Sequence, residues 1–398
     1  MSQNSVSRGI AFAGDLHLSR AIYGGELPNM TGDSEFSLQQ IVAHCRSEDL
    51  DLLLLGDNFD MRFPDGSLLA SFLNAIQDVR VGFIQGQHDM QSIGWPGVEG
   101  HSMKSRIHLH PLDKCEVFGG SINVFGFDYT PRHKLEELLK TVPEDCEILC
   151  LHQLNKESMG LEDAWTLDMD WVPESVAMTL MGDYHGLPQD GVTNGRSWLY
   201  TGSSTMRAVG EPTSKSFVVV KRNEQSGVLE AQRIPLKTRP YIYNSLVWPN
   251  DLDDWLKAIL PACDAATQQA VDSGGVPFPS RVASPLVVCR YNVEIPDAYN
   301  RICDHLAESI SKQRLYLHLM PNGKFVPDAP DYVHDDGIVI TAESVINEAV
   351  DRELSPVLHS LAMELVDSTD PKSVITDFKT RHQVLDDPTV ALPMSSNV

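Results

Sequence analysis

The chain contains little that would place it in a membrane or outside the cell. No run of about 18 apolar residues, the length that a membrane-spanning helix needs, occurs among its 398 residues. The first ten residues, MSQNSVSRGI, lack the apolar stretch behind a basic start that marks a secretion signal. The seven cysteines are irregularly spaced, and Cys146 and Cys150, the closest pair, have no second pair beside them to complete a zinc site. We therefore expect a cytoplasmic protein with reduced thiols and no membrane partner.

Positive charge is also scarce. The chain has 31 Lys and Arg against 55 Asp and Glu, a net charge of -24, with -14 on the first 235 residues and -10 on residues 236–398. Because DNA binding usually depends on Lys and Arg contacts to phosphate, this balance argues against tight DNA binding by the chain alone. Bound divalent cations or a basic partner would offset the negative charge locally.

Two motifs of common enzymes are missing. No Gly-x-x-x-x-Gly-Lys-Ser/Thr occurs, so any ATP hydrolysis would have to come from a partner. The serine-rich stretch TGSSTMRAVG at 201–210 lacks the strand-to-helix turn of a serine hydrolase, which argues against that class. His108 and His110 precede Pro111 away from any predicted strand end, and we expect them in a surface turn.

Short apolar runs rich in Val, Ile, Leu and Phe recur along the chain, and five of them end in polar side chains. The polar residues at these five ends are Asp15 and His17, Asp57 and Asp60, Gln87 and His88, His152, and Asp183 and His185. Helical patterns lie between the runs, at 33–45, 66–79 and 131–142. Alternating strands and helices predict an α/β fold, in which ligands gather outside the carboxyl ends of the strands.

The five polar ends are therefore expected to converge on one site. A single Gly-Asp turn or a lone histidine is usually structural, but five such ends in order are not expected from turns alone. Together they supply carboxylate, imidazole and amide oxygen, the ligands that hard and borderline divalent metals prefer. The sequence therefore predicts a metal site.

The order of these motifs resembles the calcineurin-like metallophosphoesterase superfamily. The motifs read Asp15-x-His17, Gly56-Asp57-x-x-Asp60, Gly86-Gln87-His88-Asp89, His152 and Gly182-Asp183-x-His185. Two positions depart from the pattern, since Gln87 stands for Asn and Asp183 stands for the first histidine of the last motif. Both side chains still offer oxygen to a metal. We expect the changes to be linked, because a longer amide weakens one metal contact and an added carboxylate strengthens another.

The resemblance implies a role for each of these residues. The ligands that it implies are Asp15, His17 and His185 for the first metal, Asp57 as the bridge, and Gln87, His152 and Asp183 for the second. His88 would face the scissile phosphate, as a charge stabiliser or as the acid that protonates the leaving group. Asp60 and Asp89 would orient histidines or the loop from outside the ligand set. The two metals would be manganese, with magnesium as the alternative.

The stretch after the last motif indicates one family within this superfamily. SWLYTGSSTMRAVGEPTSKSFVVVKR at 197–222 contains a Gly-Ser turn, Glu211 and a Lys-x-Phe strand, and it is similar to the SbcD-type double-strand-break repair nucleases, including phage recombination nuclease subunits. This resemblance implies a four-layer αββα metallophosphoesterase sandwich over 1–235. It further implies a small α+β capping domain for DNA recognition over 236–330 and a C-terminal helical region over 331–398 with a disordered end.

The family also suggests a function and partners. Apolar residues at helical spacing continue from Thr341 for about 25 residues, and this helix would either pack on its own domain or dock an SbcC-type, SMC-like ATPase. We expect a manganese-dependent DNA exonuclease or endonuclease that hydrolyses phosphodiesters with two metals in a recombination or DNA end-processing complex. The sequence does not decide whether the chain forms a homodimer. If a phage encodes the chain, the expected location is the cytoplasm of the host.

Two alternatives remain. One is a phosphoesterase for small molecules or phosphoproteins, which the acidity of the chain favours. The other is a structural subunit that binds metal with little turnover, which the changes at Gln87 and Asp183 allow.

Overall fold

The computed structural model describes residues 8–19, 32–60, 64, 66–89, 106–159, 164–207 and 211–322, together with the backbone of 332–333 and 339–340. Residues Met1–Asn322 group into one compact unit and Gly323–Val398 into a second, in which β16 (Tyr332–Val333) pairs antiparallel with β17 (Val339–Ile340). Within these residues, no helix is long and apolar enough to cross a bilayer. The helix predicted from Thr341 lies outside the described residues.

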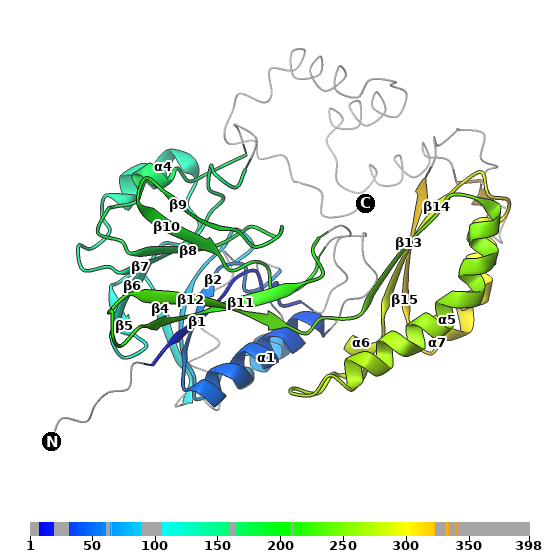
Figure 1. Cartoon of the computed structure of the whole chain (residues 1–398), viewed down its shortest axis with the longest axis horizontal. Coiled ribbons are helices and arrows are strands. Elements are labelled where there is room, and N and C mark those ends of the chain that lie inside the picture. The colour runs from blue at the N-terminus through cyan, green and yellow to red at the C-terminus, as the bar shows by residue number, and fades with distance from the viewer. Residues whose placement is uncertain are drawn as a thin grey trace, which may run out of the picture. The chain divides into compact units, whose positions relative to one another are not determined.

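One six-stranded sheet contains the N-terminal strands and two later ones (Figure 1). Its order is β12-β11-β1-β2-β3-β4, with the bounds Leu229–Leu236, Lys215–Arg222, Ile10–Ala13, Asp51–Leu55, Arg80–Ile84 and His108–Pro111. β1 to β4 are parallel, and β11 pairs antiparallel with β1 and β12. Almost every residue of β1, β2 and β3 is buried, which explains their unbroken apolar sequences, since a parallel strand is covered on both faces.

The second six-stranded sheet is built from the middle of the chain. Its order is β5-β6-β7-β8-β10-β9, with the bounds Glu116–Phe118, Ile122–Gly126, Ile148–His152, Met178–Gly182, Arg196–Tyr200 and Asp190–Thr193. β6, β7, β8 and β10 are parallel, while β5 and β9 pair antiparallel at the two edges. A short 3-10 helix, η2 (Met169–Trp171), precedes β8.

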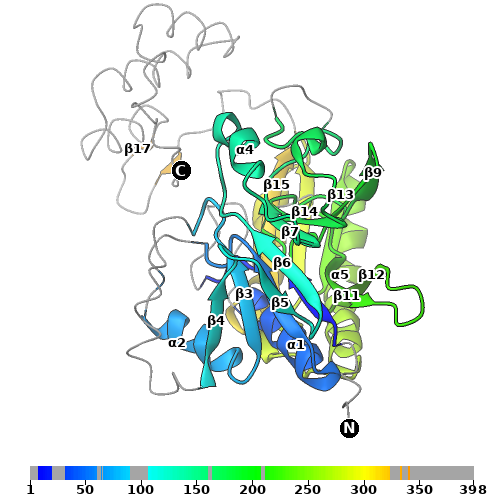
Figure 2. The ribbon, with the colours of Figure 1, turned by 90° about the vertical axis from the view of Figure 1, so that its left-hand side faces the viewer.

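Helices cover the outer faces of the two sheets (Figure 2). α1 (Asp33–Glu48) and α2 (Gly66–Ala75) share an apolar cluster with the first sheet, and α4 (Arg132–Leu139) shares another with the second. A third cluster joins residues of both sheets, among them Phe12 of β1 and Ile148 of β7, so the sheets pack face to face. The predicted four-layer αββα arrangement is confirmed.

A smaller parallel sheet follows in the order β13-β14-β15 (Figure 1). Its strands are Tyr241–Leu246, Leu286–Asn292 and Tyr316–Asn322, and its helices are α5 (Pro249–Val271), α6 (Ser280–Ala283) and α7 (Ala298–Ser311). α5 and α7 cover one face through a cluster that includes Trp255, Val287 and Ile302. These strands and helices agree with the α+β character predicted for this region. The division at 1–235, 236–330 and 331–398 stays a prediction.

Two local features differ from the expectations. His108 and His110 lie in the edge strand β4 and not in a surface turn, because residues 108–111 pair in parallel with residues 80–83 of β3. The helical pattern over 66–79 gives a helix that ends at Ala75, after which the backbone N–H of Val79 donates to the carbonyl of Ile76 in a turn.

Candidate metal centre

The predicted polar strand ends meet at one edge of the two large sheets. Asp15 and His17 follow β1, Asp57 follows β2, Gln87 and His88 follow β3, His152 ends β7, and Asp183 and His185 follow β8. Backbone hydrogen bonds tie the first two turns together, from the N–H of Asp15 to the carbonyl of Gly56 at 3.1 Å and from the N–H of His17 to the carbonyl of Asp57 at 2.8 Å. Strands of both sheets therefore deliver side chains to one place, as expected for the carboxyl ends of parallel strands.

Four of these residues adopt a left-handed backbone. The angle φ is 52° at Asp15, 44° at His17, 49° at Asp57 and 81° at Asp183. Few residues other than glycine take this conformation, and Asn, Asp and His are the types most enriched in it. Each strand thus ends in a sharp turn that its residue type permits. Such sparsely populated backbone conformations cluster at functional sites.

Asp15, His17 and His185 form the first group of candidate ligands. Their ligand atoms lie within 4.8 Å of one another. Nε2 of His17 lies 3.2 Å from Nε2 of His185, which lies 3.4 Å from Oδ1 of Asp15. Asp15 and His17 are fully buried. Two imidazole nitrogens and a carboxylate oxygen that face one another match the donor set of a divalent cation.

Asp15, Asp57 and His152 form a second group of the same kind. Nδ1 of His152 lies 2.6 Å from the carbonyl oxygen of Leu55, which can only accept a hydrogen bond, so Nδ1 carries the proton and Nε2 has a lone pair available. This Nε2 lies 3.4 Å from Oδ2 of Asp57 and 3.8 Å from Oδ1 of Asp183.

The carboxylates around His152 favour a positive charge at this position. Burial would lower its pKa, but the carboxylates of Asp57, Asp15 and Asp183 outweigh burial and raise the pKa well above the ordinary value. Buried negative charges that face a nitrogen lone pair are balanced by a cation, and either a proton or a metal ion meets this demand. The residues present therefore fit a metal ion.

Asp57 lies between the two groups. Its Oδ2 is 3.8 Å from Nε2 of His17 and 3.4 Å from Nε2 of His152, and its Oδ1 accepts a hydrogen bond of 2.9 Å from the backbone N–H of His88. Burial would raise the pKa of Asp57, but His152 and His88 bring it below the ordinary value, so the carboxylate is ionised. A Cβ atom at Gly86 would collide with Oδ1 of Asp57, and only glycine fits there.

The two departures from the superfamily pattern contact each other. Nε2 of Gln87 donates a hydrogen bond of 2.7 Å to Oδ1 of Asp183. The backbone N–H of Asp183 lies 3.1 Å from both carboxylate oxygens of Asp15, so Asp183 is also tied to the first group. The longer amide and the added carboxylate thus form one hydrogen-bonded unit beside His152.

We expect Gln87→Asn to retain hydrolysis and Asp183→Ala to lose the second metal first. Gln87→Asn restores the residue of the superfamily pattern, whereas Asp183→Ala removes a carboxylate oxygen that lies 3.8 Å from Nε2 of His152. Calorimetric titration of both variants and the wild type with Mn²⁺ measures the number of sites. Two unaltered sites in Asp183→Ala would show that Asp183 is only a turn residue.

His88 forms a third group of candidate ligands with His17 and Asp60, and its side chain is more exposed than those of the first two groups. Its side chain is 37% exposed, its Nε2 lies 3.9 Å from Oδ2 of Asp57, and its Nδ1 lies 3.8 Å from Oδ1 of Asp60. Oδ1 of Asp60 is also 3.3 Å from Nδ1 of His17. A carboxylate in this position orients an imidazole from behind, so that the other ring nitrogen faces the site.

Asp89 is fully buried and fixes the loops behind the site. Its carboxylate accepts hydrogen bonds from the backbone N–H groups of Asn58 and Phe59, which follow β2, and of Gly86, which follows β3. Burial raises the pKa of Asp89 to about 6, although these N–H groups oppose the shift. The carboxylate of Asp89 therefore ties the segment that follows β2 to the segment that follows β3.

Three charged residues that the sequence motifs do not predict as part of the site also reach it, namely Arg207, Glu211 and Lys215. Nη2 of Arg207 donates to Oδ1 of Asp60 at 2.5 Å, Oε1 of Glu211 lies 3.2 Å from Nδ1 of His185, and Nζ of Lys215 donates to Oε2 of Glu211 at 3.0 Å. Burial would raise the pKa of Glu211, but His185 and Lys215 lower it to about 2. Glu211 belongs to the stretch that resembles the SbcD-type nucleases, so the sequence contains a signal for it. No sequence pattern indicates Arg207.

Comparison with known sequences gives a limited match. No protein-family model matches the chain. The DNA double-strand break repair protein Mre11 of Sulfurisphaera tokodaii is 25% identical over 196 residues, which cover 43% of this chain and 47% of that protein. The chain therefore spans about half the length of this curated relative.

Comparison with solved structures gives matches of low TM-score. A hypothetical protein from Thermus thermophilus is 12% identical with a TM-score of 0.35, over 57% of this chain and 100% of that one. Vps29 from Chaetomium thermophilum is 13% identical with a TM-score of 0.27, over 57% of this chain and 96% of that one. A zinc complex of Vps29 from Entamoeba histolytica is 12% identical with a TM-score of 0.26, over 57% and 98%.

The fold agrees with the class of protein that the motif order predicts. Two packed six-stranded sheets flanked by helices are the layers expected of a calcineurin-like metallophosphoesterase. The overlap with Mre11 covers less than half of either chain, so membership of the superfamily stays a prediction.

Proposed function

We propose that this chain is a metal-dependent DNA nuclease that hydrolyses phosphodiester bonds as one subunit of a recombination or DNA end-processing complex. The observation that carries this proposal is the convergence of ligand atoms from both sheets. The atoms of Asp15, His17 and His185 lie within 4.8 Å of one another, as do those of Asp15, Asp57 and His152. Because the groups share Asp15 and meet at Asp57, they suit the paired cations of a two-metal phosphodiesterase.

The chain's residues would hold two divalent cations. The first would be held by Asp15, His17, Asp57 and His185, and the second by Asp57, Gln87, His152 and Asp183. When bound, the cations would lower the pKa of a water molecule, neutralise the phosphate oxygens and stabilise the leaving oxygen. Because Asp183 supplies oxygen where the superfamily has an imidazole, we expect manganese, with magnesium as the alternative.

Two side chains would act on the substrate directly. His88, the exposed histidine of the site, would face the scissile phosphate and either stabilise its charge or protonate the leaving oxygen. Arg207 supplies positive charge on the same side, since its guanidinium donates to Asp60 and its Nη1 lies 3.4 Å from Nε2 of His17. These groups would attract a phosphate to an otherwise acidic chain.

Two observations support DNA as the substrate. The curated relative is a DNA double-strand break repair protein, matched over 196 residues. The Gly-Ser turn, Glu211 and the Lys-x-Phe strand resemble the SbcD-type nucleases, and in the structure Glu211 and Lys215 support His185.

One assay separates this proposal from the alternatives. The purified chain is incubated with Mn²⁺ and, in separate reactions, with linear DNA, a cyclic nucleotide and a generic phosphomonoester, each with an EDTA control. We expect Mn²⁺-dependent cleavage of the DNA. Hydrolysis of the cyclic nucleotide or the monoester without DNA cleavage would favour a small-molecule phosphoesterase. Mn²⁺ binding without any turnover would favour a structural subunit.

The C-terminal region is proposed to bind an SbcC-type, SMC-like ATPase. Deletion of residues 341–398 should spare basal Mn²⁺-dependent cleavage, because every proposed ligand lies between Asp15 and His185. The same deletion should abolish association with the ATPase in a pull-down that compares it with the full chain. Recovery of the ATPase by the truncated protein would count against this role.

A further inference from the structure

Lys215 is a buried lysine whose ammonium group lies behind the candidate metal centre. It begins β11, its side chain is 3% exposed, and its Nζ donates to Oε2 of Glu211 at 3.0 Å and to Oγ of Ser203 at 2.8 Å. Oγ of Ser203 donates its own proton to the carbonyl of Thr205, so it is free to accept from Lys215. A buried charge is costly unless it is paired and hydrogen-bonded, and Lys215 is both.

Glu211 connects this ammonium group with a proposed metal ligand. Its Oε2 accepts from Nζ of Lys215 and, at 3.1 Å, from the backbone N–H of Arg207, while its Oε1 lies 3.2 Å from Nδ1 of His185. Because an ionised carboxylate only accepts hydrogen bonds, Nδ1 of His185 carries a proton. Nε2 of His185 is then the nitrogen left to a cation, and it lies 3.4 Å from Oδ1 of Asp15.

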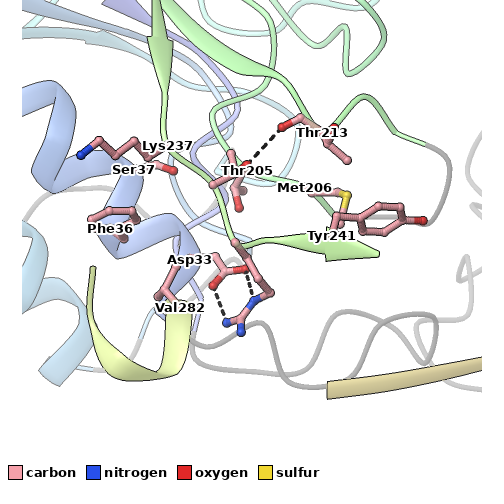
Figure 3. Close-up of a pocket in the computed structure, with 11 residues that line it drawn as sticks. Asp33, Phe36, Ser37, Thr205, Met206, Thr213, Lys237, Tyr241 and Val282 are labelled. Atoms are coloured by element: carbon pink, nitrogen blue, oxygen red, sulfur yellow. Dashed lines mark hydrogen bonds and ion pairs between the residues drawn. The ribbon is translucent and has the colours of Figure 1, made fainter. Parts of the chain in front are cut away.

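The loop that presents the N–H of Arg207 to Glu211 is held by its neighbours. Oγ of Ser37, on α1, donates to the carbonyl of Ser204 at 2.7 Å. Met206 packs in one apolar cluster with Tyr241 of β13, and Figure 3 shows the two side chains next to each other. The backbone at Arg207 is therefore fixed from two sides, and Oε2 of Glu211 meets two donors whose positions are set by the fold.

We propose that Glu211 and Lys215 are positioning residues that set the affinity of the first metal through the tautomer of His185. Glu211 holds the proton of His185 on Nδ1, and Lys215 together with the N–H of Arg207 holds Glu211 in the orientation that does so. Neither residue touches the metal or the substrate. The proposal rests on the metal centre of the proposed function and is independent of DNA as the substrate.

An amide cannot replace the carboxylate of Glu211. In Glu211→Gln, an amide oxygen that accepts from Nδ1 of His185 leaves the NH₂ group facing two donors, Nζ of Lys215 and the N–H of Arg207. If the amide is flipped, its NH₂ group faces Nδ1, which must then accept, so the proton of His185 moves to Nε2 and blocks a cation there. One orientation leaves donors facing donors, and the other removes a metal ligand.

Calorimetric titration of the full chain with Mn²⁺, without any DNA, tests the proposal. We expect Glu211→Gln to weaken binding at one site about 10- to 100-fold, as is typical when the partner behind a metal ligand is lost. The matched control is Glu147→Gln, since Glu147 also accepts from a basic side chain, that of Arg222, and from a backbone N–H, that of Asn123. Glu147 precedes β7, whose opposite end carries His152, so this variant should bind Mn²⁺ like the wild type.

Lys215→Met tests whether the effect passes through the lysine. It removes the donor that faces the amide in Glu211→Gln, so Glu211→Gln should cost less Mn²⁺ affinity in the Lys215→Met background than in the wild type. If Glu211 acted without Lys215, the loss would be the same in both backgrounds.

Two further measurements separate positioning from a loss of structure. Thermal unfolding in EDTA shows whether each variant is folded without a metal. The visible absorption of bound Co²⁺ depends on the ligands of the ion, and we expect the spectrum of Glu211→Gln to differ from that of the wild type because one imidazole ligand is displaced. This readout decides the proposal on Glu211→Gln alone if Lys215→Met does not fold.

An unchanged Mn²⁺ affinity and Co²⁺ spectrum in Glu211→Gln, or equal losses of Mn²⁺ affinity in the two backgrounds, would overturn the proposal. A chain that shows the expected coupling between Glu211 and Lys215 but does not cleave DNA would support the positioning role and refute the nuclease. DNA cleavage together with Mn²⁺ binding that is independent of Glu211 would do the reverse.

Discussion

Asp57→Asn is expected to abolish Mn²⁺-dependent hydrolysis and to remove most metal binding. Oδ2 of Asp57 lies 3.8 Å from Nε2 of His17 and 3.4 Å from Nε2 of His152, one imidazole from each ligand group. An amide in its place removes the negative charge that both cations would share. Asn keeps the size of the side chain and tolerates the left-handed backbone, where φ is 49°, so the fold should be preserved.

Calorimetric titration with Mn²⁺ and a DNA cleavage assay measure the two effects of Asp57→Asn. Thermal unfolding gives a readout without turnover, because an ion that binds the native state raises the melting temperature. Mn²⁺ should stabilise the wild type and leave Asp57→Asn nearly unchanged. The matched control is Asp49→Asn, since Asp49 has a similar φ of 52° but pairs with Arg8 at the surface. Full activity in Asp57→Asn would refute the two-metal mechanism.

His88→Asn should lower turnover about 100-fold, which corresponds to about 2.7 kcal/mol of transition-state stabilisation. The side chain of His88 is 37% exposed, whereas those of His17 and His152 are fully buried, so His88 is the histidine best placed to meet a substrate. Because no metal is assigned to it, Mn²⁺ occupancy and DNA affinity should stay close to those of the wild type.

Single-turnover cleavage, Mn²⁺ titration and DNA binding on the same preparation separate these effects of His88→Asn. His133→Asn is the control, since His133 is exposed on α4. If DNA binding disappears along with turnover, His88 holds the substrate and does not act as the acid or the charge stabiliser.

The layers of the fold and the meeting of the strand ends follow from local sequence patterns. The unbroken apolar runs of β2 and β7 are five residues long and buried almost throughout, and their hydrophobicity together with their short length predicts interior strands. Parallel strands bring their carboxyl ends to one edge, which is why the sequence alone predicts that Asp15, Asp57 and His152 lie together.

The remaining features depend on contacts between distant residues. Arg207 reaches Asp60 across 147 positions of the chain, through a loop whose path no periodicity specifies. Gln87 and Asp183 are 96 positions apart, and the sequence suggests a link through a metal, whereas the structure has a direct hydrogen bond. The sequence does not predict β4. Its four residues, His-Leu-His-Pro, are partly exposed and show no strand pattern, and backbone pairing with β3 holds them in the sheet.

The left-handed turns at Asp15, His17, Asp57 and Asp183 limit how this site can diverge. Asp, Asn and His enter that backbone conformation more readily than other residues with a side chain, and a β-branched residue there is an outlier. Substitutions that leave the strand ends in place are therefore exchanges among carboxylate, amide and imidazole. Asp183, which stands where the superfamily has a histidine, is one such exchange. A change in the metal that the candidate centre prefers would therefore need no change in the backbone geometry that presents its ligands.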